Sequence, residues 1–182
     1  TASFHNISQI FQCKTYISAM TFRLKINQFT NDGNGGVEAM GDNRCRVLII
    51  DGQGGRIGKQ LAEAIGQDPR IELTAAGTNS AATVNMMKGG VRTAATGENA
   101  VVVGCRRADI IAGPIGIVIA DALMGEVTPR MAAAVGQSLA KKILIPVNKC
   151  DNIVIGTGAR PVAELIEEAV ALILKAVNSG AY

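Results

Sequence analysis

The stretch 46–58 constrains the fold of this chain more than any other part of its sequence. The apolar run 47–50 has the pattern of a buried strand and ends in Asp51, and four glycines follow between positions 52 and 58. A helical pattern begins at once, over 59–67. This order of strand, glycine turn and helix is typical of α/β proteins, in which it directs the N-terminus of a helix toward a phosphate group.

The glycine turn is the first predicted binding element. Glycine is favoured there because such turns need positive φ angles and because backbone N–H groups must approach a ligand without an intervening Cβ atom. The predicted contacts are Asp51, Gly52, Gln53, Gly54, Gly55, Arg56, Ile57 and Gly58, with phosphates bound at the start of a helix that follows Gly58. The glycines also have a purely structural interpretation, close packing of strand and helix. Asp51 either contacts a ribose or Mg²⁺, or only accepts from nearby backbone N–H groups.

The rest of the chain after residue 58 alternates between strand and helix patterns. Strands are predicted at 71–77, 91–95, 108–112, 142–147 and 152–155, and helices at 81–87, 129–139 and 162–177, with a turn at 97–99 leading into the apolar run 101–103. Ser80 is the predicted N-cap of the first of these helices, and Thr128 followed by Pro129 predicts the start of the second. The alternation implies an α/β fold, a Rossmann-like three-layer sandwich with a mainly parallel sheet.

Polar or glycine-rich turns follow several of these strands. Ligands of such folds bind past the carboxyl ends of the strands, so we expect Thr78, Asn79 and Ser80 to face a ribose and Gly113 and Pro114 to wall the site. NAD-binding proteins usually carry an acid at the end of the second strand, and positions 78–80 contain none. Because Arg56 could pair with a 2′-phosphate, the pattern favours NADP over NAD. The missing acid equally suits a mononucleotide.

The first 45 residues differ in composition from the rest of the chain. All four phenylalanines lie within residues 1–29, and the first acid is Asp32. We therefore divide the chain into an N-terminal extension, 1–45, and a nucleotide-binding domain, 46–182. The extension is interpreted either as sequence ahead of a natural start at Met40, or as an arm that docks on a partner subunit. A targeting segment has less support, because basic residues are few there.

Composition argues against several classes of function. The net charge of +3 comes from scattered basic residues with few aromatic neighbours, which disfavours nucleic-acid binding. No apolar run reaches the ~20 residues that a membrane span requires. Four widely spaced cysteines and one histidine, His5, form no metal-binding pattern, so we expect no metal and a cytoplasmic protein with reduced thiols. Cys105, beside Arg106 and Arg107, is a candidate nucleophile that has no histidine to activate it.

Two resemblances extend this interpretation. The run Gly-Gln-Gly-Gly-Arg-Ile-Gly-Lys-Gln-Leu, 52–61, resembles the phosphate turn of the dihydrodipicolinate reductase family, which uses NADPH or NADH. The histidine-rich catalytic segment of that family has no counterpart here, so its reaction is not implied. From 46 to about 174, phrases such as Ala-Gly-Thr-Asn-Ser and Gly-Pro-Ile-Gly-Ile-Val-Ile-Ala-Asp resemble a family of short bacterial proteins of unassigned function, found largely in anaerobes. This second resemblance implies no activity and supports treating the N-terminal residues as an addition.

Two other chemistries stay open on sequence. Asn148-Lys149-Cys150-Asp151 matches the guanine-reading element of GTPases, although the glycine turn lacks P-loop spacing and Gln60 replaces the Ser or Thr that would bind Mg²⁺. The layout of 108–147 resembles nucleoside 2-deoxyribosyltransferase-like proteins, in which Glu126 or Asp121 would act on the N-glycosidic bond of a nucleoside, by transfer or hydrolysis. Glu126 also has a plain interpretation as a first-turn acid of the next helix.

We therefore predict a Rossmann-like protein that binds NADP or NAD and acts as a sensor, a regulatory module or a small oxidoreductase. The domain 46–182 is short for a reductase that must also build a substrate site. This favours a binding module, or a homo-oligomer in which a second subunit completes the pocket. Whether the chain is an enzyme is left open at this stage.

Overall fold

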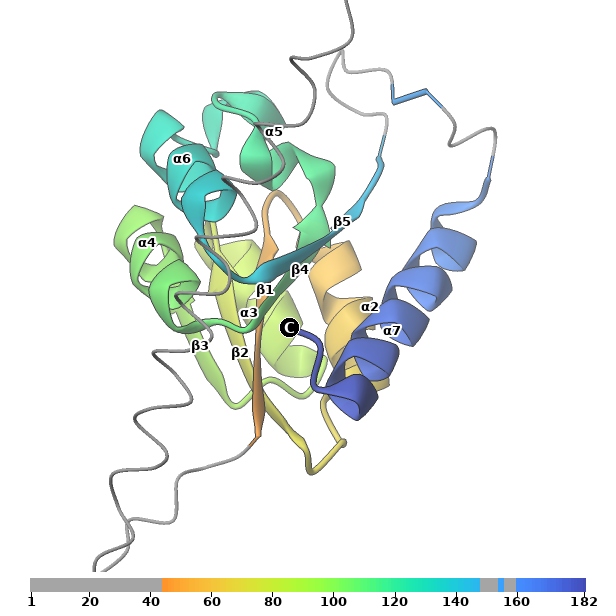
Figure 1. The fold of residues 1–182 in the computed structure, drawn as a ribbon. Helices are drawn as coiled ribbons and strands as arrows, with labels where there is room; N and C mark the ends of the chain where they lie inside the picture. Colours follow the sequence, from red (N-terminus) through yellow and green to blue (C-terminus); the bar gives the residue numbers. More distant parts are fainter. Residues whose placement is uncertain (1–43, 148–153, 156–159) are drawn as a thin grey trace, which may run out of the picture. The chain divides into compact units, whose positions relative to one another are not determined.

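The computed structural model describes residues 44–147, 154–155 and 160–182 (Figure 1). The predicted extension, apart from its last two residues, and the 148–151 motif lie outside this part of the chain. Of the strand predicted at 152–155, only the last two residues are described, and they are not in a strand.

Strands and helices alternate along the described chain. The elements are β1 (Cys45–Asp51), α2 (Arg56–Ile65), β2 (Ile71–Gly77), α3 (Ser80–Lys88), β3 (Thr93–Thr96), α4 (Glu98–Arg107), β4 (Ile110–Pro114), the 3₁₀ helix η1 (Ile115–Val118), α5 (Ala122–Gly125), α6 (Pro129–Gln137), β5 (Lys141–Ile145) and α7 (Val162–Ser179). The five strands form one sheet in the order β3-β2-β1-β4-β5, and every neighbouring pair is parallel. The predicted α/β class is confirmed, with a sheet that is parallel throughout its described strands.

The middle strand, β1, explains why the sheet has a layer of helices on each face. Successive side chains of a strand point to opposite faces. Val47 and Ile49 pack into a core shared with α2, α3 and α7, whereas Leu48 and Ile50 pack into a core shared with α4 and α6. Because both faces are buried, the strand is an unbroken apolar run rather than an alternating one.

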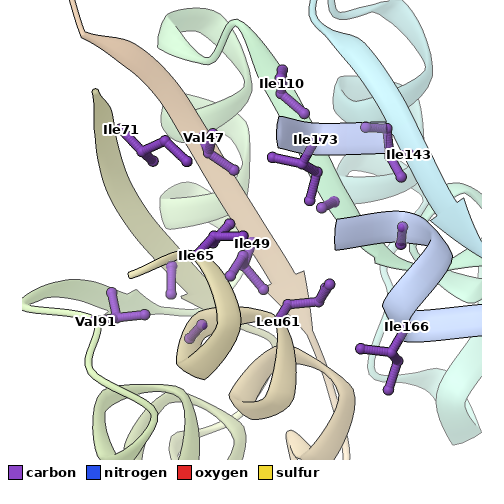
Figure 2. Close-up of a cluster of buried hydrophobic side chains, with 14 of the residues drawn as sticks. Val47, Ile49, Leu61, Ile65, Ile71, Val91, Ile110, Ile143, Ile166 and Ile173 are labelled. Atoms are coloured by element: carbon purple, nitrogen blue, oxygen red, sulfur yellow. The ribbon is translucent and has the colours of Figure 1, made fainter. Parts of the chain in front are cut away.

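The last helix, α7, returns to the face that α2 already covers. Ile166 and Ile173 of α7 lie in the same core as Leu61 of α2 and Ile143 of β5 (Figure 2). The apolar residues of α7 recur at helical spacing, as the sequence predicted for 162–177, and those that face the core are buried. No helix in the described ranges is both long and apolar enough to span a bilayer.

The sequence analysis missed helix α4, and it also did not predict the short helices η1 and α5. Residues 98–107, which the pattern assigned to a turn and an apolar run, form α4. Val101, Val102 and Cys105 are its buried residues, a spacing that places them on one face of a helix. The apolar run 101–103 is too short to distinguish a helix from a strand by periodicity alone.

The capping of α3 also differs from the prediction. The N-cap is Asn79, whose Oδ1 accepts a hydrogen bond from the Ala82 N–H at 2.8 Å, and Ser80 is the first helical residue. Asn and Ser cap helices about equally well, so the choice between neighbouring positions depends on where the strand before them ends. The predicted cap of α6 is confirmed, since Thr128 Oγ1 accepts from the Met131 N–H at 3.2 Å.

Candidate functional site

The carboxyl end of β1 leads directly into the glycine turn, and Asp51 organises that turn from inside. Asp51 is 4% exposed. Its carboxylate accepts from the Gly52 N–H at 2.8 Å and from the Gly58 N–H at 2.7 Å. Burial raises the pKa of Asp51 above its ordinary value, while the hydrogen bonds from Gly58 and Gly52 act in the opposite direction. This geometry matches the interpretation of Asp51 as an acceptor for nearby backbone groups.

Positions 55 and 58 each favour glycine, but for different structural reasons. Gly55 is the N-cap of α2 and has a φ of 62°, and a Cβ there would lie 2.6 Å from the Ala82 Cα. The helix therefore begins at Arg56 and not after Gly58, which corrects the predicted boundary. Gly58 lies in the first turn of α2, where a Cβ would lie 2.6 Å from the Met86 Sδ. Only one of these two glycines is thus required for a positive φ.

A cavity of about 350 Å³ opens beside this turn. Its described lining residues are Asp51, Gly52, Gln53, Gly54, Gly55, Arg56, Ile57, Gln60, Pro114, Ile115, Gly116, Ile119, Leu123, Val147, Val162 and Ala163. The strand order reverses between β1 and β4, because β2 follows β1 on one side and β4 returns on the other. In open parallel sheets, ligands bind in the crevice outside the carboxyl ends of the strands at this reversal.

Polar groups of the turn are available to a ligand in this cavity. Among the described residues, the backbone N–H groups of Gly54 and Arg56 have no hydrogen-bond acceptor. The Arg56 side chain is exposed and takes part in none of the ion pairs found among those residues. The N-terminus of α2 and one guanidinium therefore border a largely apolar cavity, an arrangement that suits an anionic group attached to an apolar or aromatic one.

Glu126 contacts the same turn, and it links its own segment to the β1–α2 and β2–α3 loops. Its Oε2 accepts from the Gln53 N–H at 2.7 Å, from Thr78 Oγ1 at 2.6 Å and from Asn79 Nδ2 at 2.8 Å. Burial acts to raise the pKa of Glu126, but the hydrogen bonds from Thr78, Gln53 and Asn79 outweigh it, so the pKa lies below its ordinary value. The carboxylate is ionised at neutral pH.

The structure does not place Glu126 in the first turn of a helix. The residue precedes Pro129, the first residue of α6, by three positions, and its carboxylate binds the β1–α2 and β2–α3 loops instead. Asp121, the other candidate for glycosidic chemistry, is exposed and has a φ of 62°. Neither carboxylate lines the cavity.

The other predicted contacts are distributed around the turn. Pro114 lines the cavity, and Gly113 is buried beside β1, where a Cβ would collide with the Ile50 carbonyl oxygen. Thr78 and Asn79 face Glu126, while the exposed Ser80 lies at the start of α3.

Several lining residues were missed by sequence reasoning. Leu123 belongs to α5, and Val162 and Ala163 belong to the start of α7. The helical pattern of 162–177 predicted α7 itself, but no local signal states which face of the sheet a final helix covers.

The surroundings of the described cysteines disfavour the reactive thiolate, since both side chains are buried. Burial raises the pKa of the Cys105 thiol to about 11, although Lys142 acts to lower it. Burial likewise raises the pKa of Cys45 to about 11. Since the thiolate is the nucleophilic form, Cys105 is a poor candidate nucleophile. Within 44–147, 154–155 and 160–182, no group of three or more His, Cys, Asp or Glu residues is placed to hold a metal ion.

Comparison with known proteins identifies a family without an assigned activity. A family model described as a domain of unknown function, DUF3842, matches residues 46–178. No curated protein matches the chain. The family match agrees with the predicted resemblance to proteins of unassigned function, and it does not bear on the reductase-like turn or on a bacterial origin.

Proposed function

This chain belongs to the DUF3842 family, and we propose that it binds a nucleotide, NADP or NAD, at the turn between β1 and α2. The observation that carries the proposal is the cavity at the reversal of strand order, which is lined by every turn residue from Asp51 to Ile57. The turn ends at the N-terminus of α2, a ten-residue helix whose dipole favours a negative group.

The residues around the turn suit a dinucleotide in their chemistry. The Gly54 and Arg56 N–H groups would bind the pyrophosphate, since a Cβ is absent at Gly54 and nothing lies within 4 Å of that position. The apolar wall of Ile115, Ile119 and Leu123 would cover the part of the ligand on the β4 side. Ligand pockets of about 300–1,000 Å³ are usual for small molecules. The cavity of about 350 Å³ would hold part of a dinucleotide, and the remainder would extend toward Thr78.

The cavity offers little for acid–base catalysis. Among its described lining residues, only Asp51 and Arg56 carry ionisable side chains, and Asp51 is buried and bonded to two backbone N–H groups. A general acid or base must reach the proton that it transfers. The site therefore favours a sensor or regulatory module over a small oxidoreductase that supplies its own catalytic groups.

Thermal unfolding of the full chain with a panel of ligands tests the proposal. The panel contains NADP, NADPH, NAD, NADH, ATP, GTP and a 2′-deoxynucleoside. A ligand at one hundred times its dissociation constant adds about 2.7 kcal/mol to the free energy of unfolding, which raises the Tm by several degrees. We expect this shift with a dinucleotide.

A matched pair of glycine variants shows whether the turn is the site. Gly54→Val places a side chain in the cavity lining, where nothing lies within 4 Å of the new Cβ atom, so we expect the fold to tolerate it. The added side chain should block the pyrophosphate from reaching the backbone N–H groups of the turn. Gly136→Val in α6 is the control, because its Cβ also meets nothing within 4 Å and it lies outside the cavity lining. Gly55→Val is unsuitable, since its φ and its contact with Ala82 would disturb folding itself.

The outcomes separate the candidate functions. A dinucleotide shift that is lost in Gly54→Val and kept in Gly136→Val supports the proposal. A shift with GTP alone, or with the deoxynucleoside alone, would favour the GTPase-like or the transferase-like prediction. No shift with any ligand would leave the glycines as packing residues and remove the proposed function.

A further inference from the structure

We propose that Glu126 selects a nucleotide whose ribose carries free 2′ and 3′ hydroxyls, and therefore NAD over NADP. The inference rests on the proposed function of the β1–α2 turn, and it names the ligand class of that same site. It also reverses the preference for NADP that Arg56 suggested in the sequence.

Glu126 supplies a carboxylate at the place where the sequence has none. In dinucleotide-binding α/β folds, an acid near the end of the second strand accepts hydrogen bonds from the ribose. The residue after β2 in this chain is Thr78, which is uncharged. The Thr78 Oγ1 nevertheless lies 2.6 Å from Oε2 of Glu126, which is 48 positions further along the chain. The acid thus reaches the end of β2 through the tertiary fold.

The hydrogen bonds of this carboxylate all end on one of its two oxygens. All three hydrogen bonds to Glu126 end on Oε2, and one of them comes from the Gln53 N–H of the phosphate turn. Oε1 accepts no hydrogen bond from any described residue. A carboxylate held by three donors is fixed in position before a ligand arrives. The remaining oxygen would accept hydrogen bonds from the diol of a ribose whose pyrophosphate is bound at the turn.

The charges around Glu126 disfavour a 2′-phosphate. Arg56 lines the cavity and Glu126 does not, and the two residues form no ion pair. No ion pair among the described residues includes Glu126. A phosphate on the 2′-oxygen would replace a hydrogen-bond donor by an anion and would be repelled by the ionised carboxylate.

Dissociation constants for NAD and NADP, measured by titration calorimetry on the full chain, test this selection. We expect NAD to bind about tenfold or more tightly than NADP, since hydrogen bonds to a charged acceptor are about twice as strong as neutral ones. In Glu126→Gln, the amide oxygen can still accept from the three donors, but the negative charge is gone. The ratio of the two constants should then fall toward one.

Glu98→Gln is the matched control for the loss of a carboxylate. Glu98 also accepts a hydrogen bond from a threonine, with its Oε2 2.7 Å from Thr128 Oγ1, but it lies in α4 and outside the cavity lining. This variant should keep the wild-type ratio. A change of equal size in Glu98→Gln would show that the ratio follows general charge and would overturn the role of Glu126.

The remaining outcomes are distinct. If wild type binds NADP as tightly as NAD or more tightly, the selection is overturned and the proposed function stands. If wild type binds neither dinucleotide, the proposed function fails and the selection fails with it. If Glu126→Gln keeps the preference for NAD, another group reads the ribose. Should that variant not fold, the wild-type ratio alone decides, because it needs no substitution.

Discussion

At the residue scale, two carboxylates beside one turn have opposite environments. Asp51 is buried at the end of β1, and both of its carboxylate oxygens accept hydrogen bonds from backbone N–H groups of its own turn. Glu126 reaches the turn from a distant segment and binds through a single oxygen. Burial raises the pKa of Asp51, whereas three donors lower that of Glu126. The surroundings of each acid, and not its residue type, make Asp51 structural and Glu126 the candidate for ligand contact.

The lowered pKa of Glu126 predicts how one variant changes stability with pH. An acid whose pKa is lower in the folded state stabilises the fold above its unfolded pKa, and this contribution is lost as the pH falls through the folded pKa. We expect Glu126→Gln to lower the free energy of unfolding by about 1 kcal/mol at pH 7. The difference from wild type should begin to shrink as the pH falls below the unfolded pKa of about 4.3, and it should be lost as the pH falls through the lower folded pKa.

Urea unfolding at pH 7 and near pH 3 measures this difference. The same loss of stability at both pH values would contradict the prediction, since it would mean that the shape of the side chain matters and its charge does not.

At the element scale, the turn before α2 is supported by the start of α3. Asn79 Nδ2 donates to the Gln53 carbonyl at 3.0 Å, and Asn85 Nδ2 donates to the Gly54 carbonyl at 2.8 Å. Gly55 lies against Ala82, so that any larger residue would push the two helices apart. The conformation of the glycine turn therefore depends on a neighbouring helix as well as on its own glycines.

Asn79 should contribute more to stability than the adjacent Ser80. Asn79→Ala removes the cap of α3 and the bonds to Gln53 and Glu126, so we expect a loss of about 2 kcal/mol in the free energy of unfolding. Ser80→Ala should change it by less than about 0.5 kcal/mol, because Ser80 is exposed and does not cap the helix. Urea unfolding of both variants decides between the two caps, and a larger effect at Ser80 would restore the capping predicted from the sequence.

At the scale of the whole described domain, α7 contributes both to the buried core and to the wall of the cavity. Its buried residues pack on α2 and β5, and its first residues, Val162 and Ala163, line the cavity. The described residues carry exposed apolar side chains at Leu139 and Met124, but nothing identifies what would cover them. The homo-oligomer therefore stays a prediction.

Truncation of one buried and one partly exposed side chain of α7 tests its place in the fold. Ile173 is fully buried, so Ile173→Ala should lower the free energy of unfolding by about 3 kcal/mol through lost burial and the remaining cavity. Leu172 is 48% exposed, and Leu172→Ala should cost less than about 1 kcal/mol. The midpoints of urea unfolding compare the two. Equal losses would contradict the packing of α7 against the sheet.

The sequence by itself determined the five strands of the described sheet, most of the helices and the position of the glycine turn. These features depend on periodicity, capping and turn chemistry within a few residues, and an alternating order of strands and helices leaves a parallel sheet as the natural outcome. Where the local signal was short, at 98–107, the prediction missed a helix.

Only the tertiary structure decided which groups meet at the turn. It brought Glu126 to Thr78 across 48 positions, placed Val162 in the cavity wall and buried Asp51 behind its own loop. Such contacts follow from how whole elements pack and from the order of strands in the sheet. The sequence around Glu126 indicates neither the packing nor the strand order. An acid that appeared to be missing from the end of β2 is present there because distance along the chain does not measure distance in the fold.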